Sequence, residues 1–191
     1  MKDILYINIP SSGGLAHYAN EMCNALVEEG NIVCQITIGN FSISPGHRKY
    51  GLYEIKNRDG NLFFRTLSYI QVVQAAYKIR KTHSYSILFI NAYQTFLDLL
   101  LIKIINVPSA CIQHEIDDRI SGRSTFTQRL FYRYLDYIIL HRFSGVKHYA
   151  IKKYNLNPTR VLEINHGLYR ENIFGGNPSS KEDEILMLGA M

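Results

Sequence analysis

The sequence predicts an α/β fold: a Rossmann-like open parallel sheet with helices on both faces. Short apolar runs alternate with segments of helical spacing along the chain, which is the pattern of repeated βα units. The chain opens with an apolar run at residues 4–9, a Pro-Ser-Ser-Gly-Gly turn and a helical pattern, as a first βα unit does. The apolar fraction of 47% and charged fraction of 19% are those of an ordinary globular protein.

The first helix is expected over residues 14–29, because apolar residues keep helical spacing there and Gly30 supplies a C-terminal stop. Its buried stripe should comprise Leu15, Tyr18, Ala19, Met22, Ala25 and Leu26. A strand should follow over residues 32–38. Residues 39–60 are rich in glycine and predict a long loop with a short strand at 52–55.

The second helix is expected over residues 61–81, with a core face of Phe63, Leu67, Ile70, Val73 and Tyr77. The later strands should lie at 86–91, 109–114, 137–140 and 161–164, and the later helices at 94–105, 125–134 and 144–154.

Composition changes near the end of the chain. Residues 175–184 are rich in glycine, serine and charge and predict an interdomain linker. Residues 185–189 read as a new buried strand. The predicted organisation is therefore a Rossmann-like domain over 1–174, a linker over 175–184, and the start of a truncated second domain over 185–191.

Several common motifs are missing from the sequence. The opening turn lacks G-x-G-x-x-G, and neither a P-loop nor a G-x-S-x-G elbow occurs. Residues 114–118 begin like H-E-x-x-H but end in aspartate, so a zincin site fails and no metal is expected. The three cysteines form no C-x-x-C pair and predict reduced core thiols. No signal peptide is recognised. The most apolar stretch, residues 96–107, is too short to span a bilayer. The expected location is therefore cytoplasmic.

The formal net charge of +5 is unevenly placed. Residues 117–153 hold eight basic and three acidic residues, which leaves thirteen of each sign elsewhere. Such a region suits anionic partners: nucleic acid, a phosphorylated substrate, or lipid headgroups on the inner surface of a membrane, to which the protein would bind peripherally. The expected contacts are Arg119, Arg123, Arg129 and Arg133. A solvated charged face without a partner is the other interpretation.

Polar residues follow several predicted strands, and the carboxyl ends of parallel strands share one edge of a sheet. Candidate substrate-binding residues at this edge are Gly13, Gly14, Asn91, Tyr93, Glu115, Ser144 and His166. The adjacent glycines let backbone N–H groups approach a ligand at the positive end of a helix, although a tight turn without a ligand fits equally.

His114 is the sharpest catalytic candidate, because it follows the apolar residues 110–112 at a strand end. Two interpretations stay open. A ring at this edge can hydrogen-bond a bound hydroxyl or phosphate, or it can be a partly buried histidine that satisfies groups of the loop backbone.

Four segments in order resemble the retaining glycosyltransferases of family 4, which have the GT-B fold. Residues 10–18 are similar to the family's glycine loop and helix, and residues 112–115 resemble its strand-end H-D/E segment. Residues 144–161 resemble its helix and P-x-R/K-V turn, and residues 164–168 resemble the segment that closes its first domain. Residues 185–189 match the strand that opens its second domain.

The resemblance implies the amino-terminal, acceptor-binding half of a nucleotide-sugar-dependent enzyme. It implies that Gly13 and Gly14 lie near the donor diphosphate and that His114 contacts the donor sugar. It also implies a saccharide or lipid-linked acceptor, no metal, and no cofactor beyond the donor itself. Tyr169 and the Ala16-His17 pair depart from the family pattern, which weakens the assignment of acceptor contacts.

The function this predicts is hexosyl transfer with retention in polysaccharide or glycolipid biosynthesis. The alternative is a non-catalytic α/β module that uses the same edge to bind a phosphorylated ligand or a protein partner. A nucleic-acid partner is not expected, because the basic region contains no recognised binding module.

Overall fold

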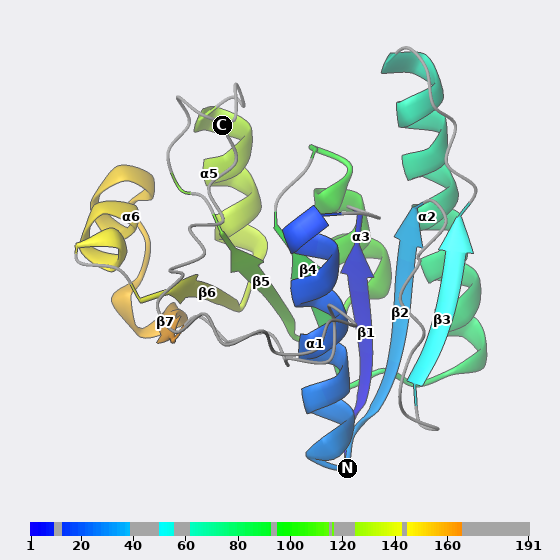
Figure 1. Ribbon diagram of the computed structural model, residues 1–191. Coiled ribbons are helices and arrows are strands. Elements are labelled where there is room, and N and C mark those ends of the chain that lie inside the picture. Colours follow the sequence, from blue (N-terminus) through cyan, green and yellow to red (C-terminus); the bar gives the residue numbers. More distant parts are fainter. Residues whose placement is uncertain are drawn as a thin grey trace, which may run out of the picture.

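Seven parallel strands form one sheet in the computed structural model (Figure 1). The structure describes residues 1–9, 13–38, 50–55, 62–92, 95–114, 116, 125–142 and 145–165. The strand order is β3-β2-β1-β4-β5-β6-β7, and every neighbouring pair is parallel. The predicted Rossmann-like class is therefore confirmed. The linker and the strand predicted over residues 175–191 lie outside the described residues.

The strands agree closely with the predicted ones. They are β1 (Asp3–Asn8), β2 (Ile32–Ile38), β3 (Tyr50–Ile55), β4 (Ile87–Asn91), β5 (Ser109–Gln113), β6 (Tyr137–His141) and β7 (Val161–Ile164). The strand β6 runs one residue further than expected and so includes His141.

The helices are α1 (Gly13–Glu28), α2 (Leu62–Thr82), α3 (Asp98–Ile105), α5 (Thr125–Tyr134) and α6 (Val146–Tyr154), and a 3-10 turn spans Pro158–Arg160. The helix α3 starts four residues later than predicted. A turn precedes it, in which the Thr95 N–H donates to Asp98 Oδ2 at 3.0 Å.

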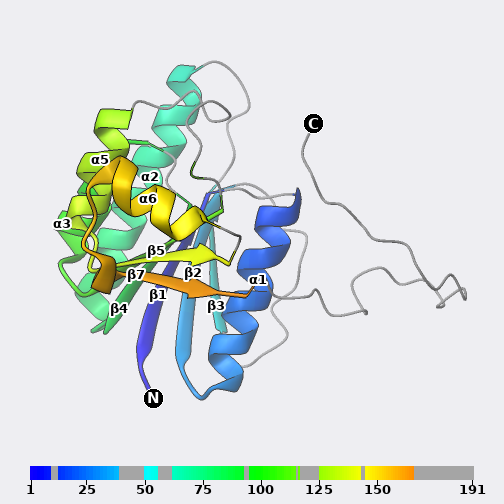
Figure 2. The same cartoon turned by 90° about the vertical axis from the view of Figure 1, so that its left-hand side faces the viewer.

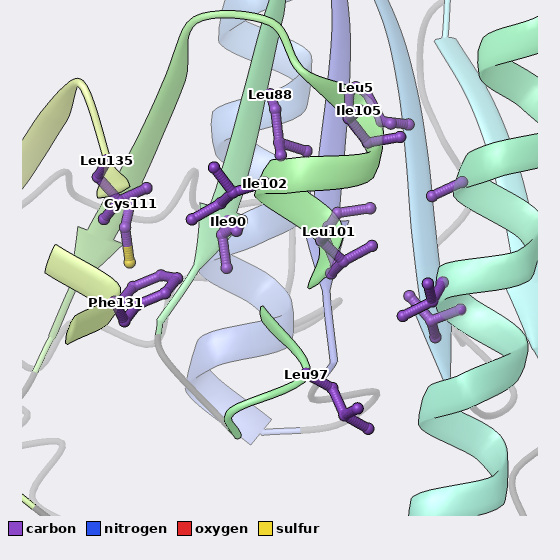
Figure 3. Close-up of a cluster of buried hydrophobic side chains, with 14 of the residues drawn as sticks. Leu5, Leu88, Ile90, Leu97, Leu101, Ile102, Ile105, Cys111, Phe131 and Leu135 are labelled. Carbon is purple, nitrogen blue, oxygen red and sulfur yellow. The ribbon is translucent and has the colours of Figure 1, made fainter. Parts of the chain in front are cut away.

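The two faces of the sheet are covered unequally (Figure 2). Within the described ranges, α1 is the one helix on one face, where Tyr18, Cys23 and Val27 meet Tyr6 and Val33. The helices α2, α3, α5 and α6 contribute to a single larger core on the other face. Figure 3 shows part of that core, including Leu101, Phe131 and Leu135.

The buried stripe of α1 differs from the predicted one. Tyr18 and Ala19 are buried as expected, but Ala25 is exposed and Leu15, Met22 and Leu26 are only partly buried. The stripe instead includes Ala16, Asn20, Cys23, Asn24 and Val27. Periodicity missed it because two of its members are asparagines, which count as polar in any hydropathy pattern.

The predicted core face of α2 is wrong in three of its five residues. Phe63, Ile70 and Tyr77 are 68%, 39% and 45% exposed. The residues that pack on the sheet are Tyr69, Val72, Val73, Ala75 and Ala76. Apolar residues occur on every side of this helix, so their spacing could not fix which side meets the sheet.

The three cysteines are free thiols, as the sequence predicts. Cys23 and Cys111 are fully buried. Burial also raises the pKa of the Cys34 thiol, against the opposing effect of its hydrogen bond with Tyr85. Among the helices that the structure describes, none combines the length and apolar character needed to cross a bilayer.

Candidate functional site

Four polar side chains form a row along the carboxyl edge of the sheet. They come from β1, β4, β5 and β6, which are neighbours in that order. The register aligns Ile7 with Ile90, so Asn8 and Asn91 end their strands at the same level. It also aligns Gln113 with Leu140, which puts His114 beside His141.

Hydrogen bonds join the four residues end to end. The Asn91 Nδ2 donates to Asn8 Oδ1 at 2.7 Å and to the Leu15 carbonyl at 3.2 Å. Asn91 Oδ1 lies 2.9 Å from His114 Nε2, and His114 Nδ1 lies 3.1 Å from His141 Nε2. Asn8 and Asn91 are fully buried and His141 is 3% exposed, whereas His114 is half-buried. The row is therefore a network held largely away from water.

The direction of each bond follows from the Asn91 amide. Its N–H groups serve Asn8 and Leu15, so its Oδ1 accepts, and His114 Nε2 must carry a proton. In a neutral His114 the Nδ1 then accepts from a protonated His141 Nε2. Both rings are thus Nε2–H tautomers. One added proton is also accommodated, with His114 Nδ1–H donating to His141 Nε2.

The start of α1 closes over this row. The edge of the Tyr18 ring meets both imidazoles, with centroids 4.7 Å from His114 and 5.1 Å from His141. Leu15, which accepts from Asn91, directly follows the glycine pair. The first turn of α1 therefore lies beside the network.

Two described residues just beyond the row, Ala92 and Ile116, also make defined backbone contacts. Ala92 follows Asn91 with a φ of 65°, a conformation that costs energy for a residue with a Cβ. Its N–H donates to the Ile112 carbonyl at 2.8 Å. The Tyr154 hydroxyl donates to the Ile116 carbonyl at 3.2 Å and so ties the chain after His114 to α6.

The row extends by one strand in the direction of β2. Thr37 pairs with Asn8 in the register and is fully buried. Its hydroxyl has no hydrogen-bond partner among the residues that the structure describes. A buried or half-buried polar side chain therefore lies at or next to the carboxyl end of five consecutive strands of the sheet.

The structure describes only some of the predicted site residues, and it brings two of them into contact. His114 and Asn91 are brought into direct contact. Gly13 begins α1 and Gly14 is exposed in its first turn. Arg129 and Arg133 are exposed on α5. Tyr93, Glu115, Ser144, His166, Arg119 and Arg123 lie outside the described residues.

Sequence reasoning missed three members of the site. Asn8 is a polar residue within the first apolar run, residues 4–9, and its position near the end of that run was the signal. His141 escaped because the strand was expected to end at Leu140. Tyr18 was assigned only to the core, although its ring packs against both histidines.

No group of three or more histidine, cysteine, aspartate or glutamate side chains suited to a metal ion occurs within the described residues. Both His114 ring nitrogens are engaged in the network, so a ligand would meet this ring at its edge or displace one of its partners.

Comparisons with known proteins identify the fold of the chain but not its family or its function. No family model matches the chain, and no curated protein matches its sequence. Solved structures do match. A complex of Anabaena Alr3699/HepE with UDP and glucose has a TM-score of 0.59 at 12% identity, over 88% of this chain and 45% of that one.

Two other neighbours are similar to the same degree. A putative UDP-N-acetylglucosamine 2-epimerase from Listeria monocytogenes has a TM-score of 0.61 at 11% identity, over 83% of this chain and 44% of that one. A ugt transferase from Siraitia grosvenorii in complex with UDP has a TM-score of 0.58 at 11% identity, over 86% and 50%. The chain therefore spans about half the length of these neighbours and has the Rossmann-like fold of one half of a GT-B protein.

Proposed function

We propose that this chain forms the amino-terminal, acceptor-binding half of a glycosyltransferase that uses a nucleotide sugar. The enzyme would be a retaining hexosyltransferase of family 4 acting in polysaccharide or glycolipid assembly. The donor half, which by resemblance binds the nucleotide sugar, would be supplied by sequence outside this chain.

One observation carries the proposal: the polar row spans the topological switch point of the sheet. The strand order reverses between β1 and β4, and ligands of open α/β sheets bind in the crevice at such a point. Asn8 and Asn91 stand on its two sides, joined by the 2.7 Å hydrogen bond. The neighbours described as UDP or UDP-sugar complexes support a nucleotide sugar as the ligand class.

The chemistry of transfer fits the groups at this edge. Retaining transfer develops oxocarbenium character on the sugar and negative charge on the departing diphosphate. The first-turn N–H groups of α1, from Gly13 and Gly14 onward, and the positive end of that helix would offset the diphosphate charge. The ring of His114 would border the sugar, held in place by Asn91 and His141.

A second candidate reaction is epimerisation at carbon 2 of a UDP-sugar, because epimerases are among the structural neighbours. The non-catalytic binding module is the third. The products of the reaction separate these functions: a new glycosidic bond, an epimerised sugar nucleotide, or neither.

The test is a turnover assay with radiolabelled nucleotide sugars and saccharide or lipid-linked acceptors. We expect no transfer by the 191-residue chain alone. In the protein that carries both halves, His114→Ala should lower kcat/KM by about tenfold to a thousandfold, as the loss of site contacts does. The control is His148→Ala, at an exposed position of α6.

Clear transfer by the chain alone would remove the need for a donor half. Unchanged kinetics of His114→Ala in the two-half protein would leave His114 as a purely structural residue. Formation of an epimer without transfer would replace the transferase by the second candidate.

A further inference from the structure

Two imidazole rings at the carboxyl edge share a single hydrogen bond. His114 Nδ1 lies 3.1 Å from His141 Nε2, and the ring centroids are 4.9 Å apart. One proton fills this bond, so the protonation of one ring depends on that of the other. Groups coupled in this way take up protons as a pair and do not titrate as two independent histidines.

The four ring nitrogens of this pair differ in their capacity for a proton. His114 Nε2 carries one, because it lies 2.9 Å from the accepting Asn91 Oδ1. The bond between the rings holds one more. An added proton can therefore go to His141 Nδ1 without breaking either bond. A second added proton would set two N–H groups against each other across 3.1 Å, so the pair has room for one extra proton and not for two.

The extra proton gives the pair a charge that can move between the rings. While the bridging proton stays on His141 Nε2, the cation is the His141 ring, which is 3% exposed. When that proton shifts across the hydrogen bond to His114 Nδ1, the cation is the half-buried His114 ring. His141 can thus hold the added proton while His114 carries the charge at the more exposed end of the pair.

The contacts described above surround the pair with groups that are uncharged near neutral pH. The helix α1 contributes the titratable Tyr18, whose ring packs on both imidazoles. The strand β4 contributes Asn91, which links the pair to Asn8 of β1. The next titratable or charged side chains along the neighbouring elements are Tyr6 of β1, His17 and Glu21 of α1, Cys111 of β5 and Arg142 after β6. Burial among neutral groups disfavours a charge, so the pair should gain its extra proton only when an anion lies beside it.

An anion bound at the start of α1 would be such a neighbour. Leu15, in the first turn of α1, accepts from Asn91 at 3.2 Å, so this turn lies against the polar row. The first turn of a helix offers N–H groups and the positive end of the helix dipole to an anion. A cation on His114 would add to this attraction, because unit charges a few ångströms apart interact more strongly where water is scarce.

We propose that the His114–His141 pair takes up one proton when a phosphate-type anion binds at the start of α1. His141 Nδ1 receives the proton, the bridging proton moves to His114 Nδ1, and His114 carries the charge beside the anion. Proton uptake itself does not require that the protein be an enzyme. One consequence rests on the proposed function: the anion is the diphosphate of a nucleotide sugar. The free nucleoside diphosphate, which has one more negative charge, then draws the proton more strongly than the nucleotide sugar does.

Anion binding and proton uptake are linked in both directions. If the anion raises the pH of half-protonation of the pair by about one unit, the protonated pair binds the anion about tenfold more tightly than the neutral pair. Binding should therefore tighten as the pH falls through neutrality. Protonation of the anion itself works in the opposite direction, because it removes negative charge. The sign of the pH dependence thus separates the two effects.

The experiment is a pH titration of the 191-residue chain, followed by long-range nitrogen-15 spectra of the histidine rings. It is run with inorganic pyrophosphate and, as a control, with sodium chloride at equal ionic strength. In chloride the pair should be neutral near neutral pH. In pyrophosphate the signals of His114 and His141 should move together towards imidazolium values, with a midpoint about one pH unit higher, since the two rings share one charge.

Matched variants test the role of the second ring. In His141→Gln the amide can still donate to His114 Nδ1 but offers no nitrogen for the added proton. His114 should therefore lose most of its response to pyrophosphate. His148→Gln removes a histidine from an exposed position of α6 and should leave the response of the pair unchanged. Thermal unfolding of each variant, measured alongside, shows whether the chain is folded.

The absence of a pyrophosphate-dependent change at the two rings of the folded parent chain would overturn the proposal. Independent titration of each ring near the ordinary histidine value of about 6.5 would also overturn it, because the rings would then not be coupled. A full response in folded His141→Gln would mean that His114 takes the proton alone. None of these measurements involves sugar transfer, so their failure leaves the proposed function standing, and a failed turnover assay leaves the proton uptake standing.

Discussion

Replacing His141 is the most direct test of the polar row. In His141→Leu the donor to His114 Nδ1 is removed, and the edge contact with Tyr18 is lost with it. The lost hydrogen bond and the acceptor it leaves behind cost about 1–3 kcal/mol. The aromatic contact adds roughly 1 kcal/mol. The leucine recovers part of this by apolar burial, so we expect a net destabilisation of about 2 kcal/mol.

The assay is thermal unfolding, in which about 2 kcal/mol lowers the Tm by roughly 4–8 °C for a domain of this size. His141→Gln is the informative partner variant, because its amide can still donate to His114 Nδ1. It should recover at least half of the loss. His148→Leu, on the exposed side of α6, should leave the Tm unchanged.

The tautomers of His114 and His141 provide a second measurement, which a change in packing alone would not alter. Long-range nitrogen-15 correlation spectra should show both His114 and His141 protonated at Nε2 near neutral pH. A proton on Nδ1 of a neutral His114 would reverse the bond to Asn91 and refute the assigned bond directions. Equal stability of His141→Leu, His141→Gln and the parent chain would refute the energetic reasoning.

Two further predictions concern groups away from the row. Burial raises the pKa of the Cys34 thiol, so the thiolate that reacts with iodoacetamide forms only at a higher pH than in a free cysteine. Mass spectrometry should therefore find Cys34 alkylated more slowly in the native than in the unfolded chain, with the native rate still rising where the unfolded rate has levelled off. Tyr154→Phe removes a hydroxyl whose single proton is shared between Gln128 Oε1 at 2.7 Å and the Ile116 carbonyl at 3.2 Å, and denaturant unfolding should show a loss of about 1–3 kcal/mol.

The strands were predictable because their apolar runs are nearly continuous. A strand buried on both faces shows little alternation, and β1, β4 and β5 all have this character. The position of the candidate site could be predicted from the topology, because the carboxyl ends of parallel strands lie at one edge of the sheet. His114 and Asn91 could therefore be selected as candidates before any contact between them was known.

The contacts themselves could not be predicted. Asn8 and Asn91 are 83 residues apart, and only the order of the strands makes β1 and β4 neighbours. His141 shows the effect of a one-residue error in a predicted strand end. Leu140 belongs to the core under the helices, and His141, the next residue, faces the other side of the sheet. A boundary one residue short therefore removes the side chain that completes the row.

The outer surface of α2 was missed for a different reason. Hydrophobic periodicity assumes that apolar residues mark the buried side, and α2 has aromatic residues on both its sides. Phe63 and Tyr77 fitted a helical stripe as well as Tyr69 and Val73 did. An error of this kind is informative, because it identifies apolar side chains of α2 that do not pack in the core.

The switch point explains why buried polar groups occur at the edge of an otherwise apolar sheet. The chain leaving β1 enters α1 on one face, and the chain leaving β4 continues to α3 on the other. The two connections diverge, and open α/β sheets form a crevice at such a point. Apolar side chains at these strand ends would face a crevice. Asn91 instead donates hydrogen bonds to the Asn8 side chain and to the Leu15 carbonyl. The same bonds hold the glycine turn of α1 against the crevice, which makes the network both the floor of the candidate site and the link that positions its helix.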